Sequence, residues 1–141
     1  GRACVHKDYR NSHVLMLLWR GLGRYLAHNQ LRYFFGCCSL TSQDPVEGAA
    51  LRRYLEANQF THPTLRVAAW PAFRCAAACD GVAPPPLPKL MKIYLLYGAK
   101  ICSEPALDRT FKTIDYLTLM DVHELSQKTY AYFFKTRWEE P

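Results

Sequence analysis

The sequence has no apolar run long enough to cross a bilayer. Its longest apolar stretches, Val14–Trp19 and Tyr130–Phe134, fall well short of the roughly 20 residues that a membrane-spanning helix needs. It also opens without an initiator Met and without a charged and then apolar leader. We therefore expect no secretory signal, a cytoplasmic location, and a start that is a cut through a longer protein.

The sequence also has few signs of a metal or disulfide framework. Its six cysteines lie mostly within apolar stretches, and 141 residues can form a hydrophobic core without disulfides. Cys75 and Cys79 are the nearest approach to a metal-binding pair, but only a lone Cys102 follows them. We expect small buried hydrophobic side chains, reduced thiols and no metal site.

Acidic residues are almost absent from one end of the chain. Residues 1–32 contain one acid, Asp8, against six basic side chains: Arg2, Lys7, Arg10, Arg20, Arg24 and Arg32. Such an end attracts an anionic partner, whether a phosphate, an acidic carrier protein, nucleic acid or anionic lipid, and charge alone does not choose among them. The simpler alternative is a solvated basic face.

Hydrophobic periodicity predicts a strand, a helix and a second strand in the first forty residues. Arg2–Val5 has the pattern of a strand end, and Ser12 is expected to cap a helix that runs to about His28. Leu31–Cys38 is then predicted as a buried strand. The expected buried stripe of the helix is Val14, Leu18, Leu22, Tyr25 and Leu26. A strand-helix-strand unit indicates an α/β fold with the two strands roughly parallel.

The remaining elements have clear end signals. Asp44 and Pro45 predict the cap and first residue of a second helix, and residues 87–97 form a helical repeat that stops at Gly98. The proline-rich stretch between them predicts irregular structure, with one short strand around residues 65–69. A short strand at 100–103, a central strand at 111–120 and a last helix at 123–134 complete the prediction, as one domain over residues 1–141.

Several motifs together are similar to the ornithine-acyl carrier protein N-acyltransferases. They are residues 1–11 (GRACVHKDYRN), 35–40 (FGCCSL) with Asp44-Pro45, 94–100 (YLLYGAK), 104–108 (EPALD) and 111–117 (FKTIDYL). Each motif is modest, but they occur in the right order over most of the chain. The resemblance is to the C-terminal part of this family, which belongs to the GNAT superfamily and is related to long-chain N-acyl amino acid synthases and autoinducer synthases.

The resemblance implies a fold and a reaction. The fold would be GNAT-like, with a mixed central sheet flanked by helices, lacking here its N-terminal strands. The reaction would transfer a 3-hydroxyacyl chain from acyl carrier protein to the α-amino group of ornithine or another amino acid. In GNAT folds two strands splay apart around the acyl-phosphopantetheine arm, and here they would be those at Val5 and at residues 31–38.

The turn before the first long helix is the expected seat of the pantetheine phosphate. Unpaired N–H groups at a helix start carry partial positive charge, so Arg10, Asn11, Ser12 and His13 are candidate donor-binding residues, with Val5 and Cys37 on the splayed strands. GNAT proteins favour glycines in this turn. Its Arg-Asn-Ser-His sequence therefore favours carrier protein over coenzyme A, although acyl-coenzyme A remains an alternative donor.

Three residues are candidates for chemistry. Arg2 matches an arginine that related synthases keep on a strand, or is an ordinary strand-end charge. Ser39 either protonates the leaving thiolate or caps a turn, and Asp115 either forms a structural ion pair or faces the amines of the substrate. Cys37 and Cys38 are interpreted as core residues, because the family transfers the acyl group directly.

Three functions remain in competition. The first is the carrier-dependent amino acid N-acyltransferase, and the second is a coenzyme A-dependent GNAT N-acetyltransferase. The third is a non-catalytic module that binds an acidic carrier protein or an anionic membrane. The aromatic and basic end at residues 130–138 could lie on the inner membrane face or dock onto the core. Nucleic acid is not expected as a partner, and the general base is expected upstream of Gly1.

Overall fold

The computed structural model describes residues 5–75 and 77–135, which form two compact units. The first unit contains residues 5–32 and 125–135, and the second is Tyr33–Glu124. The predicted strand at Arg2–Val5 lies outside the described residues except for Val5, which is not in a strand. Within the described ranges, every helix is too short or too polar to span a membrane.

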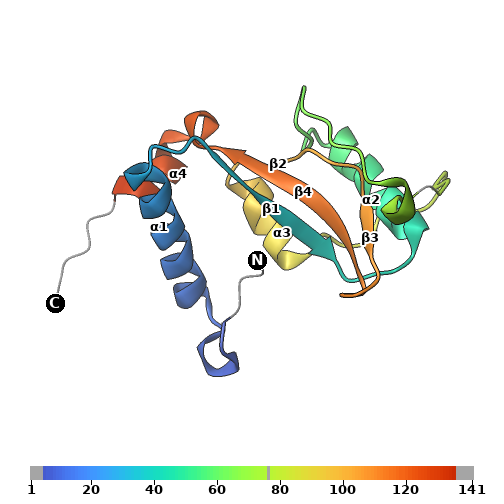
Figure 1. Ribbon diagram of the computed structural model, residues 1–141, viewed down its shortest axis with the longest axis horizontal. Coiled ribbons are helices and arrows are strands. Elements are labelled where there is room, and N and C mark those ends of the chain that lie inside the picture. Colours follow the sequence, from blue (N-terminus) through green and yellow to red (C-terminus); the bar gives the residue numbers. More distant parts are fainter. Residues whose placement is uncertain (1–4, 76, 136–141) are drawn as a thin grey trace. The chain divides into compact units, whose positions relative to one another are not determined.

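The first unit is built around helix α1, Ser12–His28 (Figure 1). A 3-10 turn, Lys7–Tyr9, precedes α1, and the unit is completed by α4, Gln127–Tyr130, and a π-helical turn, Ala131–Lys135. The predicted end at His28 is confirmed. The predicted cap is wrong by one residue, because the side chain of Asn11, not Ser12, accepts the hydrogen bond from the Val14 N–H at 2.9 Å.

The predicted buried stripe of α1 is also largely wrong. Leu26 is buried, but Leu18, Leu22 and Tyr25 are exposed, and the other buried residues are Trp19 and Gly23. The reason is Phe133, whose ring lies 5.5 Å from that of Trp19 and whose carbonyl oxygen would be 2.7 Å from a Cβ at Gly23. A tryptophan and a glycine therefore form the contact face.

The second unit is organised around strand β4, Thr113–Asp121, which pairs with three other strands. They are β1 (Tyr33–Leu40), β2 (Lys100–Ile101) and β3 (Ala106–Asp108), and all three pairings are antiparallel. The central strand predicted at 111–120 is thus confirmed, and β3 was missed. Among the described residues of this unit, parallel pairing is limited to isolated bridges, Thr61 with Ile101 and Val67 with Ser103. The predicted parallel partner of β1 falls mostly outside the described residues.

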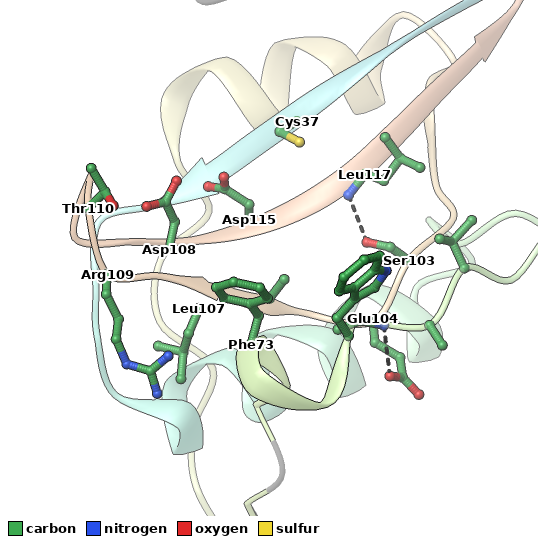
Figure 2. A pocket seen from close by; sticks show the side chains of 15 residues that line it. Cys37, Phe73, Ser103, Glu104, Leu107, Asp108, Arg109, Thr110, Asp115 and Leu117 are labelled. Carbon is green, nitrogen blue, oxygen red and sulfur yellow. Dashed lines mark hydrogen bonds between the residues drawn. The ribbon is translucent and has the colours of Figure 1, made fainter.

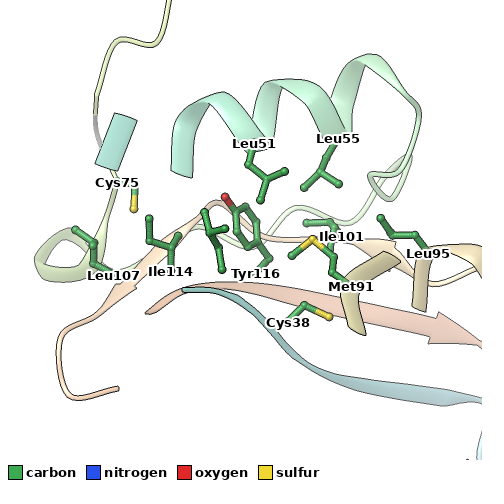
Figure 3. Close-up of a cluster of buried hydrophobic side chains, with 11 residues drawn as sticks. Cys38, Leu51, Leu55, Cys75, Met91, Leu95, Ile101, Leu107, Ile114 and Tyr116 are labelled. Carbon is green, nitrogen blue, oxygen red and sulfur yellow. The ribbon is translucent and has the colours of Figure 1, made fainter. Parts of the chain in front are cut away.

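Two helices and one face of the sheet enclose the core (Figure 3). Helix α2, Pro45–Ala57, contributes Leu51 and Leu55, and α3, Lys89–Leu96, contributes Met91 and Leu95. The predicted cap of α2 is confirmed, since Asp44 accepts a hydrogen bond from the Val46 N–H at 2.9 Å. The predicted end of α3 before Gly98 is also confirmed, and the φ of 93° at Gly98 lies in the left-handed region that favours glycine.

The buried side of β4 fixes which side chains point away from the core. Ile114 and Tyr116 are fully buried, and the Tyr116 hydroxyl donates to the Gly48 carbonyl at 2.8 Å. Because side chains alternate along a strand, Asp115 and Leu117 point to the opposite face. Burial raises the pKa of Tyr116 far above its ordinary value, so this hydroxyl stays a hydrogen-bond donor.

The proline-rich segment is irregular, as predicted, and residues 67–75 of it are hydrogen-bonded to residues 102–106. The Val67 N–H donates to the Cys102 carbonyl at 2.7 Å, and the Glu104 N–H donates to the Val67 carbonyl at 2.9 Å. A 3-10 turn, Pro71–Phe73, follows, and Arg74 forms a bridge with Ala106. These bonds hold residues 67–74 beside β3 and form the wall of the pocket described next.

Candidate functional site

A pocket of about 570 Å³ opens on the face of the sheet that points away from the core (Figure 2). Its floor comes from β1, β3 and β4 and its wall from residues 67–73, so the whole pocket lies in the unit Tyr33–Glu124. The side chains that line it are those of Cys37, Val67, Ala68, Ala69, Trp70, Phe73, Ser103, Glu104, Ala106, Leu107, Asp108, Arg109, Thr110, Asp115 and Leu117.

The pocket combines an apolar wall with carboxylates. Trp70, Phe73 and Leu117 are apolar lining residues, while Asp108 and Asp115 lie at the same end of the pocket in Figure 2. Such a lining suits a ligand that is partly hydrophobic and carries a positive charge, because ligand sites pair apolar surface with a few placed polar groups.

The three carboxylates of the pocket differ in their partners. Glu104 forms an ion pair with Arg74 at 3.3 Å and accepts a hydrogen bond from the Ala69 N–H at 3.2 Å, so it holds the wall in place. Asp108 accepts from the Phe111 N–H at 2.9 Å and fixes the turn between β3 and β4. Asp115 accepts from the Thr113 hydroxyl at 3.0 Å.

Asp115 is therefore the carboxylate best placed to meet a ligand. The structural ion pair predicted for it does not form with any residue of the described ranges, and its side chain is only half-buried. The other reading of its position, that it faces an amine, stays a prediction. Ser39 is its cross-strand partner in the β1–β4 register, so both side chains point to the same face of the sheet.

The two adjacent cysteines of β1 have opposite surroundings. The interpretation as core residues is right for Cys38, which is buried, and wrong for Cys37, which is exposed and lines the pocket. Burial raises the pKa of the Cys38 thiol to about 11, whereas the hydrogen bond with Thr118 lowers it. A buried thiol with so high a pKa is almost entirely protonated at neutral pH, as suits a packing residue.

The candidate donor-binding residues belong to the other unit. Arg10, Asn11, Ser12 and His13 are exposed and surround the first turn of α1, as the sequence predicted. The Arg10 Nε donates to the Val5 carbonyl at 2.9 Å, which holds this arginine in the turn. Their role in binding phosphate stays a prediction. Arg2 lies outside the described residues.

The described residues were also compared with the ligand sets that bind metal ions. Across residues 5–75 and 77–135, no three His, Cys, Asp or Glu side chains come together as a bound metal ion would require. Cys75 is buried, and burial raises the pKa of its thiol, as expected for a packing residue.

Sequence reasoning missed most of the pocket wall. Trp70 and Phe73 sit in the proline-rich segment, whose course depends on contacts with residues some thirty positions away. Strand β3 was not predicted, so the place of Asp108 in the lining of the pocket was missed. The run EPALD at residues 104–108 does not alternate between polar and apolar residues, so no local signal marked that strand.

Comparison with known proteins finds relatives that share almost the whole chain. It is 30% identical over 137 residues to an L-ornithine N(alpha)-acyltransferase of Rhodobacter capsulatus, matching 91% of this chain and 51% of that protein. The enzymes of the same name from Brucella abortus and Rhizobium meliloti are both 29% identical over 140 residues, 94% of this chain and 50% and 47% of theirs.

The comparisons confirm the resemblance predicted from the sequence motifs. The chain spans about half the length of the curated relatives it matches. No protein-family model matches the chain, and no solved structure matches it significantly.

Proposed function

We propose that the protein carrying this chain is an N-acyltransferase that attaches a 3-hydroxyacyl chain to the α-amino group of ornithine, the first step of ornithine-lipid synthesis. The observation that carries this proposal is the similarity to four L-ornithine N(alpha)-acyltransferases, which extends over more than nine-tenths of the chain. The pocket on the sheet is the place we assign to the amino acid.

The lining of the pocket supports the proposal that the bound amino acid has a cationic side chain. In our proposal the Asp115 carboxylate holds the side-chain ammonium of ornithine, and the apolar lining of the pocket covers its methylene groups. A carboxylate partner in a partly desolvated pocket binds an ammonium more tightly than water does. A neutral amino acid would leave Asp115 without a counter-charge.

The reaction needs few groups once the substrates are placed. The α-amine loses a proton to a base and attacks the thioester carbonyl; the new N–C bond forms, the C–S bond breaks, and the thiolate takes up a proton. Hydrogen-bond donors must hold the oxyanion of the intermediate, and backbone N–H groups of a strand can supply them. No covalent enzyme intermediate is required. Ser39, on the same sheet face as Asp115, is our candidate for the group that protonates the thiolate.

The proposed fold is of the GNAT type. The sheet with helices on its core face is compatible with this assignment. We propose that Arg10, Asn11, Ser12 and His13 receive the phosphate of the acyl donor. The N-terminal turn of α1 supports this, because helix starts attract anions.

Acyl carrier protein is the donor we favour. The basic side chains of residues 1–32 match the acidic surface of carrier proteins, and the turn before α1 lacks the glycines that a coenzyme A pyrophosphate favours. Acyl-coenzyme A is the alternative donor.

An acylation assay tests this proposal. The native protein would be supplied with 3-hydroxyacyl carrier protein, the matching acyl-coenzyme A or acetyl-coenzyme A, each with ornithine, lysine or glutamine. We expect the carrier-bound donor with ornithine to give the highest kcat/KM. Exclusive use of acetyl-coenzyme A would overturn the donor assignment, and binding of carrier protein without acylation of any amino acid would favour the non-catalytic module.

A further inference from the structure

Five large apolar side chains are exposed in two segments that also supply residues to the lining of the pocket. They come from two segments, residues 65–73 and the turn between β3 and β4, and we call them the aromatic rim: Leu65 (42% exposed), Val67 (38%), Trp70 (78%), Phe73 (46%) and Phe111 (56%). Val67, Trp70 and Phe73 line one pocket together, so they lie on one surface.

The two segments of the rim are tied to each other. The Arg109 Nη1, from the β3–β4 turn, donates to the Ala72 carbonyl at 3.0 Å, and the bond between Asp108 and the Phe111 N–H shapes that turn. Figure 2 shows Phe73 and Arg109 beside β3. Hydrogen bonds therefore hold together the two segments that carry the apolar side chains.

The two segments that carry the rim also contain exposed cationic side chains. Arg66, Arg109 and Lys112 are exposed within the same two segments, while Arg74 is neutralised by its ion pair with Glu104. Aromatic rings with flanking arginine and lysine are typical of surfaces that enter the headgroup region of a bilayer, where rings sit at the interface and cations meet lipid phosphates.

We propose that the aromatic rim docks on the surface of an anionic phospholipid bilayer. An acidic carrier protein would also meet the cations, but the rim has five exposed apolar side chains for three cations and its tryptophan is mostly surrounded by solvent. Both features suit insertion between lipid headgroups. The inference goes beyond the proposed reaction and does not depend on it.

Vesicle flotation tests the docking. The chain is mixed with vesicles of phosphatidylcholine alone or with equal parts of phosphatidylglycerol, and binding is expected only to the anionic vesicles. Trp70→Ala should lower the partition coefficient about tenfold, because it removes the largest and most exposed side chain of the rim. Arg66→Gln should lower it about fivefold. Leu96→Ala is the matched control, since Leu96 is 79% exposed on α3, and it should bind normally.

The depth of Trp70 gives a second readout. Brominated lipids should quench the tryptophan fluorescence of the bound chain, and Trp70→Phe, which keeps an aromatic ring, should float with vesicles but lose that quenching. Absence of vesicle binding would overturn the proposal. So would binding that Trp70→Ala leaves unchanged, which would place the contact elsewhere, or rim variants that lose affinity for acidic carrier protein while floating normally. Unchanged thermal midpoints show that the variants are folded.

Discussion

At the scale of single residues, the two neighbouring cysteines of β1 show how a strand places identical side chains on opposite faces of a sheet. Cys38 points into the core with Tyr116 as its cross-strand partner, and Cys37 points to the pocket with Leu117 opposite. The sequence Cys37-Cys38 does not reveal which thiol is buried. Among the described strands β1 is an edge strand of the sheet, and most of its first half is exposed.

We expect thiol reagents to distinguish these two cysteines. A pKa of about 11 in place of the ordinary 9.0 lowers the thiolate fraction of Cys38 about a hundredfold at neutral pH, and burial slows access further. Maleimide should therefore label Cys37 first, as measured by mass spectrometry with fragmentation between the two residues. Cys37→Ser is the control, because it should abolish fast labelling at residues 37–38. Equal labelling of both thiols would contradict the assigned strand register.

At the scale of elements, the two glycines inside α1 have opposite surroundings. A Cβ at Gly21 would meet nothing within 4 Å, whereas a Cβ at Gly23 would lie 2.7 Å from the carbonyl oxygen of Phe133. Both positions are helical, so the intrinsic preference for alanine over glycine is the same at each. Only the tertiary contact differs.

Gly21→Ala and Gly23→Ala therefore form a matched pair. Gly21→Ala should stabilise the fold by up to about 1 kcal/mol through helix propensity. Gly23→Ala should destabilise it by about 1–3 kcal/mol, because the terminal turn that carries Phe133 must shift. Thermal unfolding followed by circular dichroism measures both. Equal stabilisation by the two substitutions would show that Phe133 does not pack against α1 as described.

Elements with local signals were predicted well, and those set by distant contacts were not. Asp44 with Pro45 and Gly98 mark helix ends through their own backbone preferences, so α2 and the end of α3 were placed correctly. The contact face of α1 was not, because it is chosen by Phe133, more than a hundred residues later. Likewise, the wall of the pocket depends on bonds between residues 67–74 and 102–106.

At the scale of the whole molecule, the second unit holds the largest described hydrophobic cluster and the pocket, on opposite faces of one sheet. The core face was foreseeable from the apolar residues of β4, and Asp115 was recognised as the exception in that strand. That its side chain would lie in a pocket with Asp108 and an aromatic wall was not foreseeable, since those residues come from segments without a clear periodic pattern.

The central claim is that Asp115 receives the cationic side chain of the amino acid, and steady-state kinetics of Asp115→Asn test it most directly. We predict that kcat/KM for ornithine falls about tenfold to a hundredfold, mainly through KM, because a charged partner is lost. The kcat/KM for a neutral amino acid should hardly change. Asp80→Asn, at a fully exposed acid, should behave like the unaltered protein. An Asp115→Asn enzyme that keeps its full preference for ornithine, or loses activity equally towards both acceptors, would contradict the account.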